Sequence, residues 1–112
     1  MRAVPNRTSL RRRALDERLP LAERVLACVE LIPFGRVMSY KDVAEFVGSP
    51  GARHVGRVLA HDGGTVAWHR VLRSNGSCAE HLQTTQLELL AAEGVPIRNG
   101  RVDLAAARWD GH

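Results

Sequence analysis

A tryptophan, a histidine and an arginine stand side by side in residues 66–72, VAWHRVL. The chain has only two Trp, one Tyr and two Phe, so a large indole at this place is notable. A tryptophan between apolar residues is most often part of a core. The neighbours of Trp68, however, suit proton transfer (His69) and contact with an anion (Arg70). A binding role for this segment therefore stands beside a plain core role.

The composition of the chain is that of a single soluble globular domain. It has 112 residues, of which 45% are hydrophobic and 25% are charged, enough for one modest core. No apolar run is long enough to cross a membrane and no secretory signal is visible, so we expect a cytoplasmic protein. Cys28 and Cys78 lie far apart, outside any metal-ligand spacing, and are expected to be reduced thiols. The sequence predicts neither a metal site nor a cofactor.

Positive charge is concentrated at the start of the chain. The net charge is +4, and residues 1–20 account for this excess, with six arginines against two acidic residues. We interpret residues 1–18 as a basic, mobile arm and residues 19–112 as the folded domain. A second basic excess lies within residues 36–73. This distribution favours binding to a nucleic acid, although a solvated tail with scattered surface arginines explains it nearly as well.

A stretch in the middle of the chain has the pattern of two short helices joined by a tight turn. Ser39 is a good N-cap, and Asp42, three residues later, completes an acidic capping box. Gly48 is a natural left-handed end for this helix. Ser49 and Pro50 predict the start of a second helix, with serine as the N-cap and proline at the first helical position. Together these signals indicate a helix-turn-helix.

The second predicted helix has one apolar face and one basic face. Arginines and small residues share the outer face, so the backbone could approach a DNA groove closely while arginines reach phosphates or base edges. A glycine inside this helix costs about 1 kcal/mol relative to alanine, which favours a constraint from packing or close approach. The inward positions are Ala52, Val55, Val58 and Leu59, and the candidate DNA-facing positions are Arg53, Gly56, Arg57 and Ala60.

The remaining segments predict one helix before this pair and a mixed region after it. Residues 21–32 have the apolar spacing of a helix. Residues 65–72 are expected to be extended, and Asn75-Gly76 and Asn99-Gly100 each predict a hairpin turn. A further helix is expected to end at Gly94. The predicted fold class is therefore mainly α with small β hairpins, a winged helix-turn-helix DNA-binding domain.

Several segments in the same order resemble a known family. IPFGRVMSYKDVAEFVGSPGARHVGRVL, AWHRVLRSNGS, LLAAEGVPI and NGRVDL resemble the DNA-binding domain of O6-alkylguanine-DNA alkyltransferases, and more closely the alkyltransferase-like proteins, over about residues 21–109. The landmark of the alkyltransferases is Pro-Cys-His-Arg, whose cysteine accepts the alkyl group. Here the aligned residues are 67–70, with Trp68 at the cysteine position. Since indole has no sulfur nucleophile, the resemblance implies a protein with no catalytic residue.

The resemblance also implies roles for individual side chains. Tyr40 matches the tyrosine that presses on the phosphate beside the target nucleotide. Arg53 matches the arginine that enters the duplex through the minor groove and fills the vacated stack. Trp68 would line the lesion pocket and offer an aromatic face to the flipped base. His69 and Glu93 match the proton relay of the alkyltransferases and are expected to have a structural hydrogen-bonding role here.

Other positions depart from the family pattern or match it loosely. Arg70 is expected to support the lesion pocket or to contact a phosphate. The segment from Gly76 to Glu93 lacks the family's Gly/Tyr-rich loop over the pocket, and by its offset from Trp68, His81 is the nearest candidate for a residue that closes over it. Ala67 replaces the family's proline, which loosens one backbone constraint. Asp62 stands where the alkyltransferases usually have asparagine.

The function implied by the resemblance is detection of DNA damage without repair. The protein would bind double-stranded DNA that contains O6-alkylguanine, flip the lesion, and hand it to nucleotide excision repair proteins, acting as a monomer. Two alternatives remain open. Cys78 could serve as a suicide alkyl acceptor, or the domain could be a sequence-specific winged-helix transcription factor that reads undamaged DNA.

Overall fold

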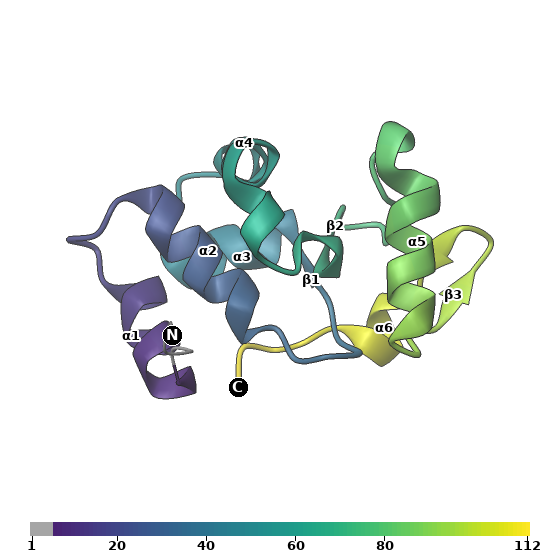
Figure 1. Cartoon of the computed structure of the whole chain (residues 1–112), viewed down its shortest axis with the longest axis horizontal. Coiled ribbons are helices and arrows are strands. Elements are labelled where there is room, and N and C mark those ends of the chain that lie inside the picture. The colour runs from purple at the N-terminus through teal and green to yellow at the C-terminus, as the bar shows by residue number, and fades with distance from the viewer. Residues whose placement is uncertain (1–5) are drawn as a thin grey trace.

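Six α-helices and four short strands make up the structure, a computed structural model that describes residues 6–112 (Figure 1). No helix in this range is both long and apolar enough to cross a bilayer. The helices are α1 (Arg7–Leu15), α2 (Leu21–Leu31), α3 (Tyr40–Val47), α4 (Ala52–Asp62), α5 (Gln83–Ala92) and α6 (Leu104–Ala107). The strands are β1 (Met38–Ser39), β2 (Val71–Leu72), β3 (Ile97–Arg98) and β4 (Arg101–Val102), and 3-10 turns occur at η1 (Gly63–Thr65), η2 (Trp68–Arg70) and η3 (Glu80–Leu82).

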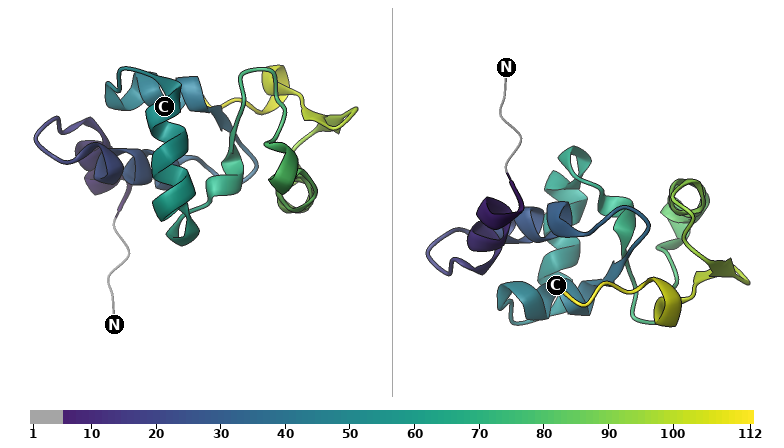
Figure 2. Two further views of the ribbon diagram at one scale, coloured as in Figure 1. Left: turned by 90° about the horizontal axis from the view of Figure 1, so that it is seen from above. Right: turned by 90° about the horizontal axis from the view of Figure 1, so that it is seen from below.

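The main core lies between α2, α3 and α4, which pack against one another. Val25 and Cys28 of α2, Val43 of α3 and Val55 of α4 are fully buried in it. Burial of each such valine stabilises the fold by roughly 1.5–3 kcal/mol. Burial also raises the pKa of the Cys28 thiol to about 12. α4 is therefore anchored by one face, while its other face lies uncovered on top of the molecule (Figure 2).

The capping signals of the first helix of the pair are confirmed. The Asp42 N–H donates to the Ser39 hydroxyl oxygen, and the Ser39 N–H donates to the Asp42 carboxylate, each over 3.0 Å. Gly48 ends α3 in the left-handed conformation, with φ +74°. A residue with a Cβ is strained at such an angle, so this short stretch determines where the helix stops.

The second helix begins later than predicted. Ser49 and Pro50 lie in the turn, and α4 starts at Ala52 after Gly51. The Ser49 hydroxyl bonds within the turn instead, since it donates to the Gly51 carbonyl oxygen over 3.2 Å and accepts from the Gly51 N–H over 3.4 Å. A Ser-Pro pair suits a turn as well as a helix start. In the described structure no side chain caps α4, so its first N–H groups remain open.

The segment after α4 is extended only at its end. The prediction of an extended stretch over residues 65–72 is wrong for Trp68–Arg70, which form η2. Only Val71–Leu72 is a strand, and it pairs in parallel with β1, Met38 opposite Val71 and Ser39 opposite Leu72. Asn75-Gly76 does form a tight turn, closed by a 3.0 Å bond from the Arg73 N–H to the Ser77 carbonyl oxygen, but residues 77–79 directly after it form no strand, so the predicted hairpin is incomplete.

The second predicted hairpin is confirmed as the wing. β3 and β4 are antiparallel, with Ile97 opposite Val102, and the loop residues Asn99 (φ +53°) and Gly100 (φ +74°) are both left-handed. This is the conformation that an Asn-Gly hairpin favours. The wing closes a second, smaller core, which consists of Val37, Leu72, Cys78, Leu90, Val95, Val102 and Ala107. The prediction of a mainly helical fold with small strands is therefore correct.

The N-terminal segment is not a mobile arm over the described residues. Arg7–Leu15 forms α1, which packs on α2 and α3. Leu10 and Ala14, one helical turn apart, are buried in the main core. Two buried apolar positions among the four arginines of α1 make too weak an apolar pattern to predict a helix that packs on the core. Residues 1–5 of the predicted arm lie outside the described residues.

Two arginines of α1 attach it to the C-terminal tail rather than reaching into solvent. Arg11 donates from Nη2 to the Gly111 carbonyl oxygen over 2.6 Å, and its guanidinium lies over the Phe46 ring at 5.6 Å. Arg7 lies over the Trp109 ring at 5.9 Å. Such contacts contribute about 0.5–1 kcal/mol each at exposed sites. In Figure 1, α1 lies below α2 and α4 lies above it, so these arginines are remote from the outer face of α4.

Leu10→Ala is expected to lower the free energy of unfolding by about 2–3 kcal/mol, because the substitution leaves a cavity between α1 and α2. Urea unfolding followed by circular dichroism measures this difference. Arg12→Ala on the exposed face of the same helix serves as the control, and its midpoint should stay within the error of the native chain. If both variants unfold at the same urea concentration, α1 does not contribute to the core.

Candidate nucleic-acid interface

The outer face of α4 is positive and low, as the sequence predicted. Arg53, Arg57 and Ala60 are exposed, and Arg53 and Arg57 stand one turn apart. No hydrogen bond or ion pair engages either arginine within residues 6–112. A Cβ at Gly56 would meet no atom of the described chain within 4 Å, so internal packing does not explain this glycine.

The open end of α4 adds to this positive surface. Arg53 is the second residue of the helix, beside the uncapped N–H groups that follow Gly51. The N-terminus of a helix carries a partial positive charge that favours anions such as phosphate. An exposed arginine and an uncapped helix N-terminus are thus both present at this end of α4.

Tyr40 is the first residue of α3 and is half-buried against the main core. Burial raises the pKa of its hydroxyl, and the positive charge of Arg73 partly opposes that effect. The phenol is therefore neutral near pH 7 and can donate a hydrogen bond to a phosphate oxygen. Arg73 lies close to the Tyr40 hydroxyl, although no local sequence pattern distinguishes this arginine from the others.

Trp68 is partly exposed rather than embedded among aliphatic side chains. It lies against the C-terminal end of α4, where a Cβ at Gly63 would come within 3.4 Å of the Trp68 Cβ and 3.5 Å of the Leu59 Cβ. Its ring is perpendicular to that of His69, with centroids 6.2 Å apart. The backbone at Ala67 has φ −76°, a value that proline also adopts, so alanine has not altered the entry to this turn.

Two hollows of the molecule lie away from Trp68. One of about 460 Å³ is lined by Phe46, Trp109 and neighbouring acidic residues, and one of about 230 Å³ lies between the start of α3 and Leu104. Neither hollow is lined by Trp68. In this structure the indole is a partly exposed wall at the end of α4, and neither of these two hollows is the lesion pocket that the resemblance implies.

A buried carboxylate holds the turn that carries Trp68. The Glu93 Oε2 lies 2.6 Å from His69 Nε2 and 3.0 Å from Arg70 Nη2, and Glu93 Oε1 accepts from Arg70 Nε over 2.9 Å and from the Gly35 N–H over 2.8 Å. Burial disfavours the charged carboxylate, but the hydrogen bonds from Arg70, Gly35 and His69 outweigh burial and hold the Glu93 pKa at about 2. His69 and Glu93 are thus joined by a hydrogen bond.

The Arg70 side chain is held in place by this network. Its Nη1 donates to the Ile32 carbonyl oxygen over 3.0 Å, and its guanidinium lies over the Phe34 ring at 5.7 Å. Its side chain is only 17% exposed. Of the two roles expected for Arg70, support of the Trp68 turn fits these contacts, and contact with a phosphate does not.

A buried glutamine that sequence reasoning missed holds the same turn from α5. Gln86 Nε2 donates to the carbonyl oxygens of His69 (3.0 Å) and Val71 (2.8 Å), and Gln86 is only 2% exposed. The sequence signal was a polar residue one turn before buried Leu90, on the face that packs inward. The turn that presents Trp68 is therefore fixed from two directions, by Glu93 and by Gln86.

Two further candidate residues do not join this site. His81 is exposed on η3, and no hydrogen bond or ring contact links it to Trp68 in the described chain. Cys78 is 5% exposed in the second core, and burial raises the pKa of its thiol. Because the thiolate is the attacking form, a buried thiol with a raised pKa is poorly suited to accept an alkyl group.

Comparison with known proteins shows that the segment with α3, α4 and the Trp68 turn matches a known family. Residues 20–95 match the family described as 6-O-methylguanine DNA methyltransferase, DNA binding domain. The chain belongs to this family. The match confirms the resemblance seen in the sequence, and it begins after α1, so the N-terminal helix lies outside the family's shared region.

Three relatives are similar to this member of the methyltransferase DNA-binding family, and two of them are named for DNA base flipping. The chain is 42% identical over 95 residues to the DNA base-flipping protein of Escherichia coli, covering 79% of this chain and 73% of the relative. It is 34% identical over 92 residues to the DNA base-flipping protein of Vibrio parahaemolyticus, covering 77% and 92%. It is 37% identical over 73 residues to the alkyltransferase-like protein of Schizosaccharomyces pombe, covering 59% and 68%.

A solved structure confirms the fold class. The alkyltransferase-like protein of S. pombe, in complex with damaged DNA containing O6-carboxymethylguanine, superposes with a TM-score of 0.71 at 31% identity. The superposition covers 79% of this chain and 93% of that chain. The predicted winged helix-turn-helix class agrees with this likeness.

Proposed function

We propose that this protein recognises O6-alkylguanine in double-stranded DNA and does not repair it. The observation that carries the proposal is Trp68, which stands at the position of the family's acceptor cysteine as a partly exposed wall at the end of α4. The proposal is supported by relatives named for base flipping and by a related protein bound to damaged DNA.

In the proposed mechanism α4 approaches the minor groove. Arg53 enters the duplex and takes the place of the extruded guanine, since a planar guanidinium stacks on bases and donates hydrogen bonds to the orphaned partner. Tyr40 bears on the adjacent phosphate. Arg57, Gly56 and Ala60 let the helix lie close to the backbone. Extrusion costs a few kcal/mol, and less for a poorly paired alkylated base.

The flipped guanine then rests on Trp68. An indole face offers stacking and apolar surface to the base and its alkyl group, which stabilises binding by about 1–3 kcal/mol. Indole has no sulfur to attack a saturated carbon, and the His69–Glu93 pair has no thiol to activate. The alkyl group therefore stays on the DNA.

The proposal extends to the fate of the complex. The protein acts as a cytoplasmic monomer and presents the distorted, lesion-bearing duplex to nucleotide excision repair proteins. It needs no metal or cofactor for this role, because recognition by stacking and charge involves no chemical step.

Binding to two matched duplexes, one with guanine and one with O6-methylguanine at the same position, tests the proposed function. Fluorescence anisotropy should show affinity for the lesion higher by roughly tenfold or more, the expected worth of one additional stacked base. Methyl-labelled DNA should keep its label after incubation. Equal affinity for both duplexes would favour a transcription factor, and label recovered on Cys78 would show a suicide acceptor.

A further inference from the structure

Three arginines outside α4 project from the wing side of the molecule without partners. Several other arginines of the chain are engaged, such as Arg11 with Gly111 and Arg70 with Glu93. Other exposed arginines, such as Arg12 and Arg36, make no side-chain hydrogen bond or ion pair within residues 6–112. Three of these unengaged arginines lie on the wing side: Arg73, Arg98 and Arg101, which we call the wing strip.

The parallel register of β1 and β2 places one end of the wing strip beside Tyr40. Ser39 lies opposite Leu72, so the next residues along the two strands are Tyr40 and Arg73, at the same end of the ladder. The electrostatic influence of Arg73 on the Tyr40 hydroxyl agrees with this proximity. The positive charge of Arg73 therefore lies close to Tyr40, the residue proposed to contact the DNA backbone.

The wing extends this charge away from Tyr40. The Val102 N–H donates to the Gly76 carbonyl oxygen over 2.9 Å, which fixes β4 against the turn that follows Arg73. Arg98 and Arg101 stand directly opposite each other in the hairpin, so their side chains share one face. Like charges at such a pair destabilise a hairpin, and an anionic ligand would offset this cost.

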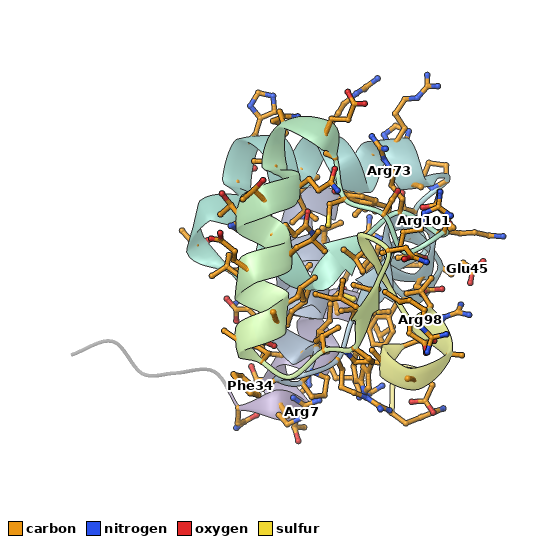
Figure 3. All side chains as sticks on the ribbon, turned by 90° about the vertical axis from the view of Figure 1, so that its right-hand side faces the viewer. Arg7, Phe34, Glu45, Arg73, Arg98 and Arg101 are labelled. Atoms are coloured by element: carbon orange, nitrogen blue, oxygen red, sulfur yellow. The ribbon has the colours of Figure 1, made fainter. Side chains whose placement is uncertain are left out.

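The three side chains lie along one side of the molecule. In Figure 3, Arg73 is uppermost, with Arg101 below it and Arg98 lower still, which leads from the side of α4 down the wing. Glu45 is visible on the same side, but its charge acts on Arg108, which is paired with Asp42. The net charge along the wing strip stays positive.

We propose that the wing strip is a second phosphate-binding surface, which holds the DNA backbone beside α4 and continues the interface from Tyr40 along the wing. This inference rests on the proposed function, because it assigns a new part of the same DNA interface. DNA is favoured over an acidic protein because the strip begins next to Tyr40 and faces outward as a line of guanidiniums.

The triple variant R73A/R98A/R101A tests this surface in salt titrations with the duplexes used above. It should bind lesion and undamaged DNA more weakly by a similar factor, roughly tenfold or more near 0.1 M salt, because phosphate contacts carry no sequence information. The slope of log affinity against log salt should fall by about one for each arginine that contacts a phosphate. Its thermal midpoint should not fall, since no folded contact is removed.

The control variant R12A/R13A/R36A removes the same charge from exposed arginines away from the strip. It should keep both the affinity and the salt slope of the native chain. Equal losses in the two triple variants, or a strip variant that binds DNA as the native chain does, would overturn the inference. If the native chain fails to prefer O6-methylguanine, the proposed function fails instead, and the comparison of the two variants on undamaged DNA still decides the role of the strip.

Discussion

Glu93→Ala is expected to lower the free energy of unfolding by about 3–5 kcal/mol, the range found when one partner of a buried ion pair is removed. The Glu93 side chain is only 7% exposed and accepts from Arg70, Gly35 and His69. Its loss leaves a guanidinium that is largely buried without a counter-charge and a backbone N–H without an acceptor. Because a small domain is stable by only about 5–15 kcal/mol, urea unfolding should detect this change easily.

The matched control is Glu88→Ala, on the exposed face of α5, which should change stability by less than about 0.5 kcal/mol. Near-equal stability of the two variants would mean that the carboxylate of Glu93 is not a structural centre. The Trp68 turn should also loosen in Glu93→Ala, which the tryptophan emission spectrum reports before global unfolding.

The same carboxylate gives the protein a specific response to acid. The Glu93 pKa falls from 4.5 to about 2 on folding, so its contribution to stability is fully present above pH 4.5 and is lost as pH falls towards 2. The stability difference between the native chain and Glu93→Gln should therefore shrink over this interval. A difference that stays constant from pH 6 to about 3 would contradict the assignment of the shift to Glu93.

Features encoded by neighbouring residues could be predicted from the sequence. The Ser39–Asp42 capping box, the left-handed Gly48 and the Asn99-Gly100 hairpin each depend on contacts within a few residues. The inward and outward faces of α4 also follow from helical spacing alone. For this reason the prediction of the helix-turn-helix with exposed arginines was correct, whereas the predicted first residue of α4 was wrong.

Features created by contacts between distant segments could not be predicted in this way. The strand β2 depends on pairing with β1, and Gln86 acquires its role only when α5 approaches the Trp68 turn. Arg73 comes next to Tyr40 through the same pairing. A local pattern carries no information about such neighbours, so the residue types of the site could be predicted from the sequence but not their arrangement.

The N-terminal segment shows how composition can mislead. Its arginines suggested a solvated arm, yet the guanidinium groups of Arg7 and Arg11 lie over the rings of Trp109 and Phe46. Long basic side chains often pack along apolar surface in this way while their charge stays near water. Net charge therefore identified a class of partner, but not which basic segment faces that partner.

Arg53→Ala is expected to weaken binding to the lesion duplex by roughly 10- to 100-fold, because the group that fills the vacated stack is removed. The free energy of unfolding should not change, since Arg53 is exposed and has no partner within residues 6–112. Arg53→Lys separates stacking from charge. Lysine keeps the positive charge but has no planar group, so it should restore little of the lost affinity if Arg53 stacks in the duplex.

A phosphate contact at Arg53 would give the opposite pattern, with affinity largely restored by lysine and a salt slope reduced by about one in the alanine variant. Arg36→Ala provides the charge-matched control, because Arg36 is exposed outside α4 and should leave lesion binding unchanged. Anisotropy titrations of the three variants at a fixed salt concentration measure these differences. Full affinity in Arg53→Ala would rule out insertion of this side chain into the duplex, and with it the proposed flipping mechanism, because Arg53 is the exposed arginine at the open end of α4.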